Sequence, residues 1–427
     1  MRWFCVVLAL SISFPTKEVT EGKGFSKWKL PLTVHCEPPF RKVVDFLKEE
    51  LEKRSGEGIV SSTSSEGRAF LLLQRQRELS PEEYRLEVGK RKILLEAGGV
   101  RGALYGVLTF LELVKDDAGF LVLPRVRIRD WPSLRIRGFH LCLQYQGVDF
   151  PFFKKLIRQM VFSRLNTLVV EVDRGMKYDR HPEISAPWAL PKDKVRELVE
   201  YARSFSIEVI PEVQSLGHQE VLLLPSHPEL AEDPSRLSDY CPSNPLVYRL
   251  LFDVMEEVIG VFRPRFLHIG HDEVKVVGVC PRCRSKKPFE LFAQDVRKIR
   301  SFLAERGIVT MMWADMLDPY YHGKGFETHR ASDLIDKDVV LCYWNYSLHS
   351  DYPGLKFLTE RGFTVVGTVW YDPENVKEMA RAVLRARGAG LLGTSWYPPS
   401  PSDDPKVQRV WEAIRLVGRY GWDPNVD

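Results

Sequence analysis

The sequence predicts an α/β protein in which a (β/α)8 TIM barrel follows a small α+β domain. After residue 130, apolar runs rich in β-branched residues alternate with amphipathic helical segments, as in parallel strands joined by helices. The series repeats eight times over about 285 residues, which fits a barrel better than an open sheet. A doubly wound open sheet is the alternative, but no G-x-G-x-x-G follows the first run.

We expect three segments along the chain. Residues 1–20 would be a signal peptide, residues 21–130 the α+β domain and residues 131–427 the barrel. The N-terminal run MRWFCVVLALSISF has the length of a signal-peptide core and is too short to span a bilayer. No clear cleavage site follows it, so a buried first strand is the alternative, and both export and a cytoplasmic location stay open.

The α+β domain is expected to contain two helices and a hairpin. Apolar spacing predicts helices over Phe40–Arg54 and Val100–Val114. Strand-like runs separated by a glycine predict a hairpin of Tyr84–Val88 and Lys92–Glu96. The polar tract SSTSSEG, residues 61–67, is typical of a loop.

The barrel elements follow the boundary at Arg129-Asp-Trp-Pro132. The predicted strands are Leu134–Leu143, Thr167–Val172, Ile207–Val213, Phe266–Gly270, Val309–Trp313, Val339–Trp344, Phe363–Val369 and Leu391–Trp396. Predicted helices between and after them include Phe152–Ser163, Lys192–Ser204, Leu246–Phe262, Pro288–Arg306, Asn375–Arg387 and Pro405–Arg419. Polar and aromatic residues collect where the strands end, which is where barrel enzymes place their sites.

Charge argues against some classes of partner. Lys and Arg exceed Asp and Glu by 61 − 57 = 4, and the excess is scattered rather than gathered in the basic stripe of a nucleic-acid-binding protein. We therefore expect no nucleic-acid partner. No stretch after the N-terminal run could cross a membrane, so we also expect no membrane span, and we expect no cofactor.

The seven cysteines are an odd number, so they cannot all pair internally. Cys280 and Cys283 form a lone C-x-x-C, to which Cys241 could add a third metal ligand. A single C-x-x-C is weak support for a metal site. Loop cysteines or a disulfide are the alternatives.

The strongest chemical signal is the run RFLHIGHDEVK at the end of the fourth predicted strand. Side chains alternate along a strand, so His268 and Asp272 should face the barrel while His271 faces the helices. Glu273 can join Asp272 only if the chain curls over the mouth there. Two adjacent carboxyls in a partly desolvated pocket should not both ionise easily, so one should hold a proton near neutral pH and donate it.

These residues resemble a known family. HIGHDEV is similar to the H-x-G-G-D-E signature of family 20 glycoside hydrolases, the β-N-acetylhexosaminidases, and Tyr105–Leu111 resembles the end of that family's small N-terminal domain. The similarity extends over most of the chain. Four further motifs look closest to the hexosaminidase D-like branch: VVEVD (Val169–Asp173), HPEI (His181–Ile184), IPEVQSLGH (Ile210–His218) and MMWADML (Met311–Leu317).

The resemblance implies a retaining exo-β-N-acetylhexosaminidase that acts on an N-acetylhexosamine-containing glycan. In this family the substrate's own 2-acetamido oxygen attacks C1 and gives an oxazolinium intermediate. Glu273 would then be the general acid and base, and Asp272 would orient the acetamido group. The implied substrate-binding residues are His218, His268, Trp313, Trp344, Tyr371 (or its neighbour Trp370), Trp396 and Glu171.

Two departures from the family pattern bear on the substrate. Cys142 and Tyr145 stand where better-known members have an Asp and a sugar-clasping Arg, and His271 replaces the signature's second Gly. A clamp could be rebuilt from His140, Gln144 or Glu171. The sequence does not distinguish N-acetylglucosamine from N-acetylgalactosamine.

Two other functions compete with the hydrolase. A metal-dependent barrel hydrolase would use His268, His271, Asp272 and His218, although an odd spacing puts the first two on opposite strand faces. A catalytically silent sugar-binding barrel would keep the pocket without turnover.

Overall fold

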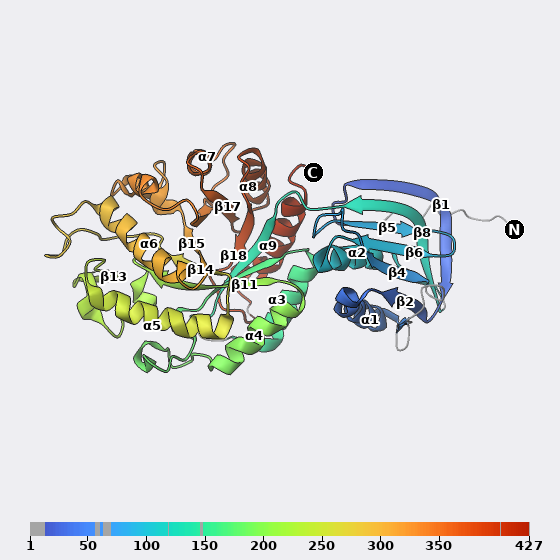
Figure 1. The fold of residues 1–427 in the computed structure, drawn as a ribbon, viewed down its shortest axis with the longest axis horizontal. Helices are drawn as coiled ribbons and strands as arrows, with labels where there is room; N and C mark the ends of the chain where they lie inside the picture. Colours follow the sequence, from blue (N-terminus) through green and yellow to red (C-terminus); the bar gives the residue numbers. More distant parts are fainter. Residues whose placement is uncertain are drawn as a thin grey trace. The chain divides into compact units, whose positions relative to one another are not determined.

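The computed structural model describes residues 13–55, 60–62, 70–117, 119–145, 148–401 and 403–426. The chain forms two compact units, Met1–Ser133 and Leu134–Asp427 (Figure 1). Most of the expected leader, and residues 63–67 of the expected polar loop, lie outside the described residues. Residues 18–20, the last three of that leader segment, are instead the first residues of a long strand.

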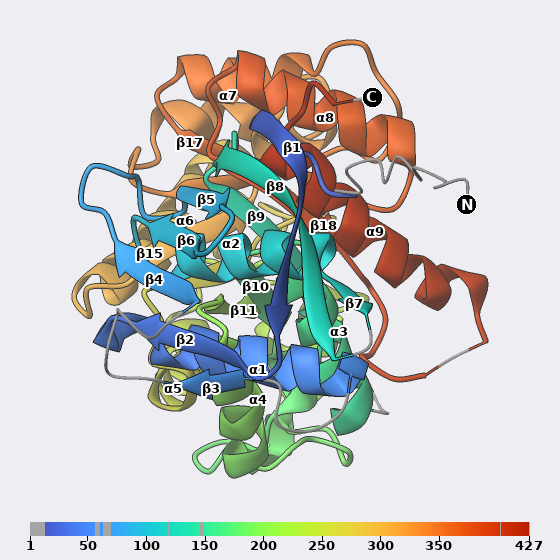
Figure 2. The same ribbon diagram turned by 90° about the vertical axis from the view of Figure 1, so that its right-hand side faces the viewer.

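The first unit is a mixed sheet with two helices on one face. The sheet order is β1-β8-β5-β6-β4-β2-β3, and β7 pairs with β8. Figure 2 shows β1 lying along β8, as their antiparallel register requires. The elements are β1 (Glu18–Lys29), β2 (Leu32–Cys36), α1 (Arg41–Ser55), β3 (Val60–Ser62), β4 (Leu71–Arg75), β5 (Tyr84–Val88), β6 (Ile93–Ala97), α2 (Val100–Leu113), β7 (Lys115–Asp117) and β8 (Phe120–Asp130).

Both helices and the hairpin predicted for this unit are present. β5 and β6 pair antiparallel, with Val88 opposite Ile93. α2 is the more buried helix because apolar residues occupy most of its surface. It packs on β5 and β6 and against α1.

The second unit is a closed barrel of parallel strands, which confirms the predicted fold class. Its order is β10-β11-β14-β15-β16-β17-β18-β9, and β18 pairs with β9 to close the ring. An open doubly wound sheet is therefore excluded. The strands are β9 (Ile136–Cys142), β10 (Thr167–Glu171), β11 (Glu208–Ser215), β14 (Phe266–Gly270), β15 (Val309–Trp313), β16 (Val340–Trp344), β17 (Thr364–Val369) and β18 (Gly390–Thr394), each within two residues of its predicted run.

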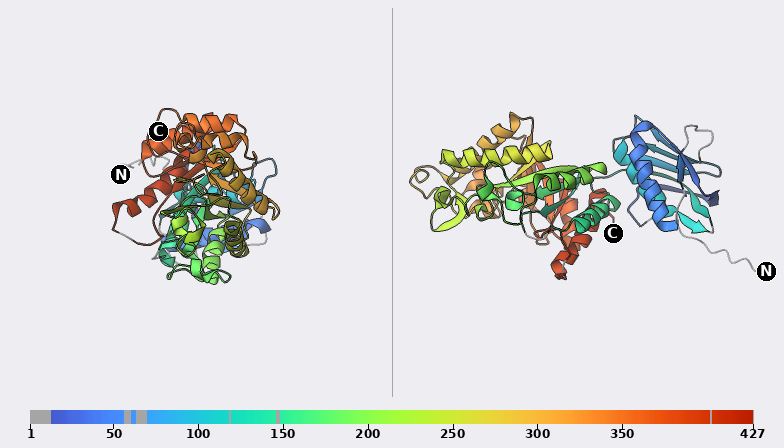
Figure 3. Two further views of the ribbon diagram at one scale, coloured as in Figure 1. Left: turned by 90° about the vertical axis from the view of Figure 1, so that its left-hand side faces the viewer. Right: turned by 90° about the horizontal axis from the view of Figure 1, so that it is seen from below.

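Helices surround the barrel (Figures 1 and 3). Side chains of Asp149, Asn244 and Asp372 accept hydrogen bonds from the first-turn amides of α3, α5 and α8, which satisfies otherwise unpaired donors. The helices are α3 (Phe150–Phe162), α4 (Lys192–Ser204), α5 (Pro245–Phe262), α6 (Pro288–Ala304), α7 (Pro353–Glu360), α8 (Pro373–Arg385) and α9 (Pro405–Trp422). None of the described helices has the length and apolar character needed to cross a membrane.

Two connections depart from the simple strand–helix alternation. A short hairpin, β12 (Ala231–Asp233) and β13 (Arg236–Tyr240), precedes α5. β15 is followed by short 3-10 helices over Asp315–Leu317, His322–Lys324 and Thr328–Asp333 instead of an α-helix. The run Asp-Pro-Tyr-Tyr-His-Gly-Lys-Gly after β15 explains this, because Pro and Gly interrupt helical hydrogen bonding.

The closing seam of the barrel should tolerate no added methyl group. A Cβ on Gly390 would lie far inside the contact distance of Ile136 O on the adjacent strand. We expect Gly390→Ala to lower the free energy of unfolding by about 1–3 kcal/mol, measured as a lower melting temperature by calorimetry. Gly260→Ala is the matched control, since a Cβ there meets open space and the change should stabilise α5 by up to about 1 kcal/mol. Equal melting temperatures for the two variants would contradict this account.

Candidate active site

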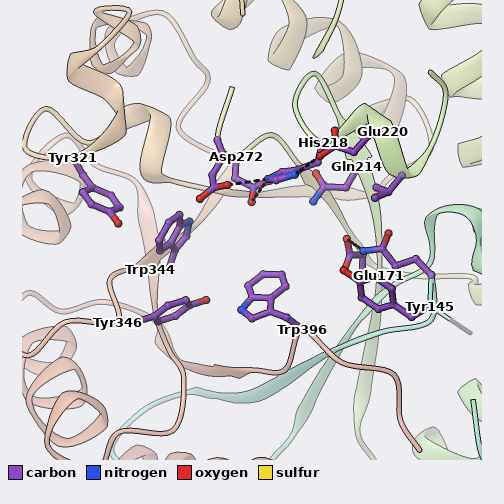
Figure 4. A pocket seen from close by; sticks show the side chains of 13 residues that line it. Tyr145, Glu171, Gln214, His218, Glu220, Asp272, Tyr321, Trp344, Tyr346 and Trp396 are labelled. Carbon is purple, nitrogen blue, oxygen red and sulfur yellow. Dashed lines mark hydrogen bonds and ion pairs between the residues drawn. The ribbon is translucent and has the colours of Figure 1, made fainter. Parts of the chain in front are cut away.

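A cavity of about 500 Å³ opens among the C-terminal ends of the barrel strands (Figure 4). Its lining includes most of the residues that the sequence singled out and several that it did not. The lining residues are Gln144, Tyr145, Glu171, Gln214, His218, Glu220, Val221, Asp272, Glu273, Tyr321, Trp344, Tyr346 and Trp396.

Backbone geometry after β14 brings the two carboxyls to the cavity. Gly270, His271 and Glu273 all have positive φ, at 64°, 77° and 45°, so the chain leaves the strand in a tight left-handed curl. A Cβ on Gly270 would overlap the side chain of Gln214, which explains why glycine occupies this position. The curl lets Asp272 and Glu273 line the same cavity.

His271 turns away from the cavity, as strand alternation predicts. It is fully buried, with its Nδ1 2.8 Å from Ser215 Oγ and its ring edge-on to Phe292 of α6. His268, in contrast, lies inside the barrel, with its ring tilted against that of Trp313 at a centroid distance of 4.5 Å. The two histidines cannot coordinate the same metal ion in this arrangement. The ligand set expected for a metal-dependent hydrolase is therefore not assembled.

Asp272 is the buried member of the pair. The residue is 6% exposed, and its Oδ1 has no hydrogen-bond partner among the described residues. Burial raises the pKa of Asp272 to about 8, although the nearby charge of His218 opposes the shift. One carboxyl of the pair therefore holds a proton at neutral pH in the ligand-free site.

Glu273 is the more exposed member, with 40% of its side chain accessible. Its Oε2 lies 3.4 Å from His218 Nε2, and its backbone N–H donates to Asp315 Oδ2 at 3.0 Å. The interaction with His218 lowers the pKa of Glu273, against a smaller opposing effect of burial. The pKa is thus raised at Asp272 and lowered at Glu273. A general acid at Glu273 would instead need a raised pKa at Glu273.

His218 holds a positive charge among three carboxyls. Its Nδ1 lies 3.3 Å from Glu220 Oε1, and its Nε2 lies 3.6 Å from Asp272 and 3.4 Å from Glu273. Burial alone would lower the pKa of His218, but these acidic neighbours raise it to about 11. His218 is therefore a fixed cation that links the acidic pair to the rim.

A buried carboxylate, Glu212, lies beneath the cavity. Trp313 Nε1–H donates to Glu212 Oε1 at 2.8 Å, while His140 Nε2 and His268 Nδ1 lie 3.0 and 3.3 Å from its oxygens. Burial would raise the pKa of Glu212, but the charges of His268 and His140 lower it below its ordinary value. Contacts with Glu212 thus hold the side chains of Trp313 and His268 below the cavity, and neither residue lines it.

Aromatic rings form one wall of the cavity (Figure 4). Trp344 is the last residue of β16 and Tyr346 lies two residues further on, with their ring centroids 5.4 Å apart. Trp396 lies two residues after the end of β18. The Tyr346 hydroxyl lies 3.2 Å from Thr394 Oγ1, and burial raises the pKa of this tyrosine, so the hydroxyl keeps its proton and can donate it in a hydrogen bond.

Tyr371 does not line the cavity. It packs beside Trp370, and the Arg409 guanidinium lies 4.5 Å from the centre of its ring. Tyr346 follows the predicted strand Val339–Trp344 by two residues, and residues at strand ends are the ones expected to form the site. Tyr321 carried no such signal, because it lies in the irregular segment after β15.

Polar groups from the first two barrel strands form the opposite wall. Gln144 Nε2 donates to Glu171 Oε1 at 2.8 Å, and Cys142 Sγ lies 2.7 Å from Oε2. Glu171 is therefore held by Cys142 and Gln144, and both of its carboxylate oxygens have a partner. Tyr145 completes this wall and is 41% exposed.

Cys241, Cys280 and Cys283 come together outside this lining. Cys241 Sγ lies 3.4 Å from Cys280 Sγ and 3.6 Å from Cys283 Sγ. None of the three is among the cavity-lining residues.

Comparison with known families gives two matches along the chain. The model described as glycosyl hydrolase family 20, catalytic domain, matches residues 135–373, and domain 2 of the same family matches residues 15–131.

Curated relatives are similar over part of their length. A β-hexosaminidase of Vibrio furnissii is 27% identical over 323 residues, covering 65% of this chain and 51% of that protein. A lacto-N-biosidase of Bifidobacterium bifidum is 25% identical, covering 70% and 27%. Human β-hexosaminidase subunit beta is 30% identical, covering 53% and 44%. The chain thus spans about half or less of these relatives.

Solved structures share the fold. The exo-β-N-acetylglucosaminidase of Vibrio harveyi, solved with N-acetylglucosamine, has a TM-score of 0.80 at 19% identity, covering 97% of this chain and 74% of that one. A β-hexosaminidase of Streptomyces plicatus has a TM-score of 0.76 at 17% identity, covering 95% and 89%.

Removing the cation beside Glu273 should change the titration of that carboxyl. We expect His218→Asn to raise the pKa of Glu273, because His218 is the main group holding it low. Asparagine also tolerates the left-handed backbone found at residue 218. The measurement is a carbon-13 NMR titration of glutamate carboxyls, with the Glu273 signal assigned by its loss in Glu273→Gln.

His227→Asn is the matched control. His227 contacts Glu229, two residues on, at the same 3.3 Å, but also contacts Glu183 and does not line the cavity. An unchanged Glu273 titration in His218→Asn would contradict the assignment of its lowered pKa to this contact.

Proposed function

Because the chain belongs to glycosyl hydrolase family 20, we propose that it is a retaining exo-β-N-acetylhexosaminidase that releases terminal N-acetylglucosamine or N-acetylgalactosamine from glycans. The observation that carries the proposal is that Asp272 and Glu273 line one cavity together with Trp344 and Trp396. Placement within the hexosaminidase D-like branch stays a prediction from the sequence.

The proposed reaction has two steps. First, the 2-acetamido carbonyl oxygen attacks C1, the bond to the leaving oxygen breaks, and Glu273 gives that oxygen a proton. The product is an oxazolinium ion, whose positive charge Asp272 stabilises through the acetamido N–H. Second, Glu273 takes a proton from water as the water attacks C1, which regenerates the acetamido group with retained configuration. No protein nucleophile is required.

This reaction needs the proton on Glu273 and the charge on Asp272, the reverse of the ligand-free preference. Substrate binding supplies both changes. The acetamido N–H gives the buried Asp272 a donor that favours its ionised form, and the sugar covers the exposed part of Glu273, which raises its pKa. We infer that substrate binding shifts the shared proton from Asp272 to Glu273. Glu273 is then protonated, and able to act as the general acid, only when substrate is bound.

The aromatic wall would hold the acetamido group in position for attack. Trp344 and Trp396 enclose it, and Trp313 supports Trp396 from below, with ring centroids 5.9 Å apart. The hydroxyl that binds the attacking oxygen would be that of Tyr346 rather than Tyr371, since Tyr346 alone of the two lines the cavity. His268 would act as a positioning residue through Glu212.

Glu171 and Gln144, with Tyr145 at the rim, would bind the sugar's outer hydroxyls in place of the family's arginine. A carboxylate can accept hydrogen bonds from vicinal hydroxyls, and an amide can both accept from them and donate to them. The absence of that arginine also favours a second candidate function, a barrel that binds N-acetylhexosamines without cleaving them.

A panel of nitrophenyl glycosides tests the reaction type. We expect cleavage of the N-acetyl-β-glucosaminide or N-acetyl-β-galactosaminide and none of the β-glucoside, together with inhibition by a thiazoline mimic of the oxazolinium ion. For Glu273→Gln, we expect kcat/KM to fall about 10²- to 10⁴-fold with a poor alkyl leaving group and much less with dinitrophenolate, which leaves without protonation.

Glu220→Gln is the matched control, because Glu220 lines the same cavity on the other side of His218. Its effect should not depend on the leaving group. Cleavage that ignores the acetamido group would contradict substrate assistance, and tight binding of N-acetylglucosamine with no turnover of any glycoside would favour the silent sugar-binding barrel.

Two tyrosine variants separate the candidates for binding the acetamido oxygen. We expect Tyr346→Phe to lower kcat on N-acetyl substrates up to about 100-fold, because the acetamido oxygen is no longer held in line with C1. Tyr371→Phe should leave kcat unchanged. Steady-state kinetics of both variants decide the matter, and a larger loss in Tyr371→Phe would overturn the assignment to Tyr346.

A further inference from the structure

Three thiols and one carboxylate converge outside the cavity. Cys241, Cys280, Cys283 and Glu232 each offer a ligand atom, and these atoms all lie within 4.8 Å of one another. Cys241, Cys283 and Glu232 are buried, at 4%, 0% and 1% exposed. Glu232 lies on β12 and Cys241 directly follows β13, whereas Cys280 and Cys283 lie in the loop that follows Glu273.

One carboxyl oxygen of Glu232 is buried without a partner among the described residues. Its Oε1 accepts the backbone N–H groups of Val279 and Cys280 at 2.8 and 3.1 Å. Its Oε2 is buried and has no hydrogen-bond partner among the described residues. A buried carboxylate oxygen is costly unless it is paired or binds a cation, so this oxygen indicates a positive ligand between Glu232 and the thiols.

The spacing of the sulfurs fits a tetrahedral metal rather than a disulfide. Zinc–sulfur bonds of about 2.3 Å place the corners of a tetrahedron about 3.8 Å apart. The observed Sγ separations from Cys241 are 3.4 and 3.6 Å, whereas a disulfide requires about 2.0 Å. The backbone of the C-x-x-C turns tightly, because Cys283 N–H donates to Cys280 O at 3.0 Å, which directs both thiols to the same side.

We propose that Cys241, Cys280, Cys283 and Glu232 bind one zinc ion. Three sulfurs and one oxygen in tetrahedral arrangement suit Zn²⁺, and a full set of four protein ligands is typical of a structural site. Ser243 Oγ lies 3.2 Å from Cys283 Sγ and accepts from Lys286 Nζ at 3.0 Å. With the thiol ionised, Ser243 donates to the sulfur, and Lys286 offsets part of the negative charge of the ligands.

The ion would anchor the segment that leaves the catalytic pair. Asp239 on β13 already accepts the backbone N–H groups of Lys275 and Val276 at 3.0 and 3.1 Å. Zinc would add a tie between the same hairpin and the same loop further along the chain, at Cys280 and Cys283. Its role is to position Glu273 through the backbone, without contact to substrate.

Metal analysis of the full chain tests the proposal directly. Protein purified without chelator from zinc-supplemented cells should contain about one zinc per chain by plasma mass spectrometry. Cys280→Ser/Cys283→Ser should contain less than about a tenth of that, and Cys36→Ser, which changes a thiol in the other unit, should keep the full amount. In the wild type, alkylation of the three thiols should require a strong chelator.

Several results would overturn the proposal. They are wild-type protein with under about a tenth of a zinc per chain, a stoichiometric amount of a different metal, or a disulfide among the three cysteines in freshly purified protein. The wild-type measurement decides even if the double variant fails to fold. Zinc content does not depend on turnover, so a zinc-loaded but inactive chain would sink the proposed function and leave this inference standing.

Discussion

Glu212 carries a full charge at the centre of the barrel, away from solvent, and the surrounding side chains are arranged to keep it so. His140 on β9, His268 on β14 and Trp313 on β15 all reach this β11 carboxylate. Losing one partner of such a buried group typically costs about 3–5 kcal/mol. The rings it holds in turn support Trp396, whose centroid lies 4.8 Å from His140, so the aromatic wall of the cavity rests on this charge.

Much of the fold could be predicted from the sequence because the barrel repeats one local pattern of strand and helix. The barrel strands lie within two residues of their predicted runs, since buried parallel strands are short, apolar and β-branched. β1 escaped prediction because most of its residues are exposed and polar, so neither alternation nor a buried run marks it. The segment after β15 could not be assigned a helix because its conformation follows Pro and Gly rather than a period.

The sequence predicted which strand ends form the site, but it did not predict which side chains line the cavity and which lie below it. Strand ends identified Glu171, Trp344 and Trp396, because the C-terminal edge of a barrel is a common surface. The same rule placed Trp313 in the cavity, whereas its indole N–H is held below by Glu212. The preference for a proton on Asp272 rather than Glu273, and the meeting of Glu232 with three cysteines, depend on contacts between distant segments that no local pattern encodes.

The polar wall of the cavity and the acidic pair with its histidine have separate origins in the chain. Gln144, Tyr145 and Glu171 come from the ends of β9 and β10, whereas His218, Asp272 and Glu273 come from the ends of β11 and β14. Hydrogen bonds tie Glu171 to Gln144 within the first group, and ion pairs tie the second group together. Under the proposed function, substitutions in the first group would alter which sugar the site prefers and leave the residues that transfer the proton unchanged.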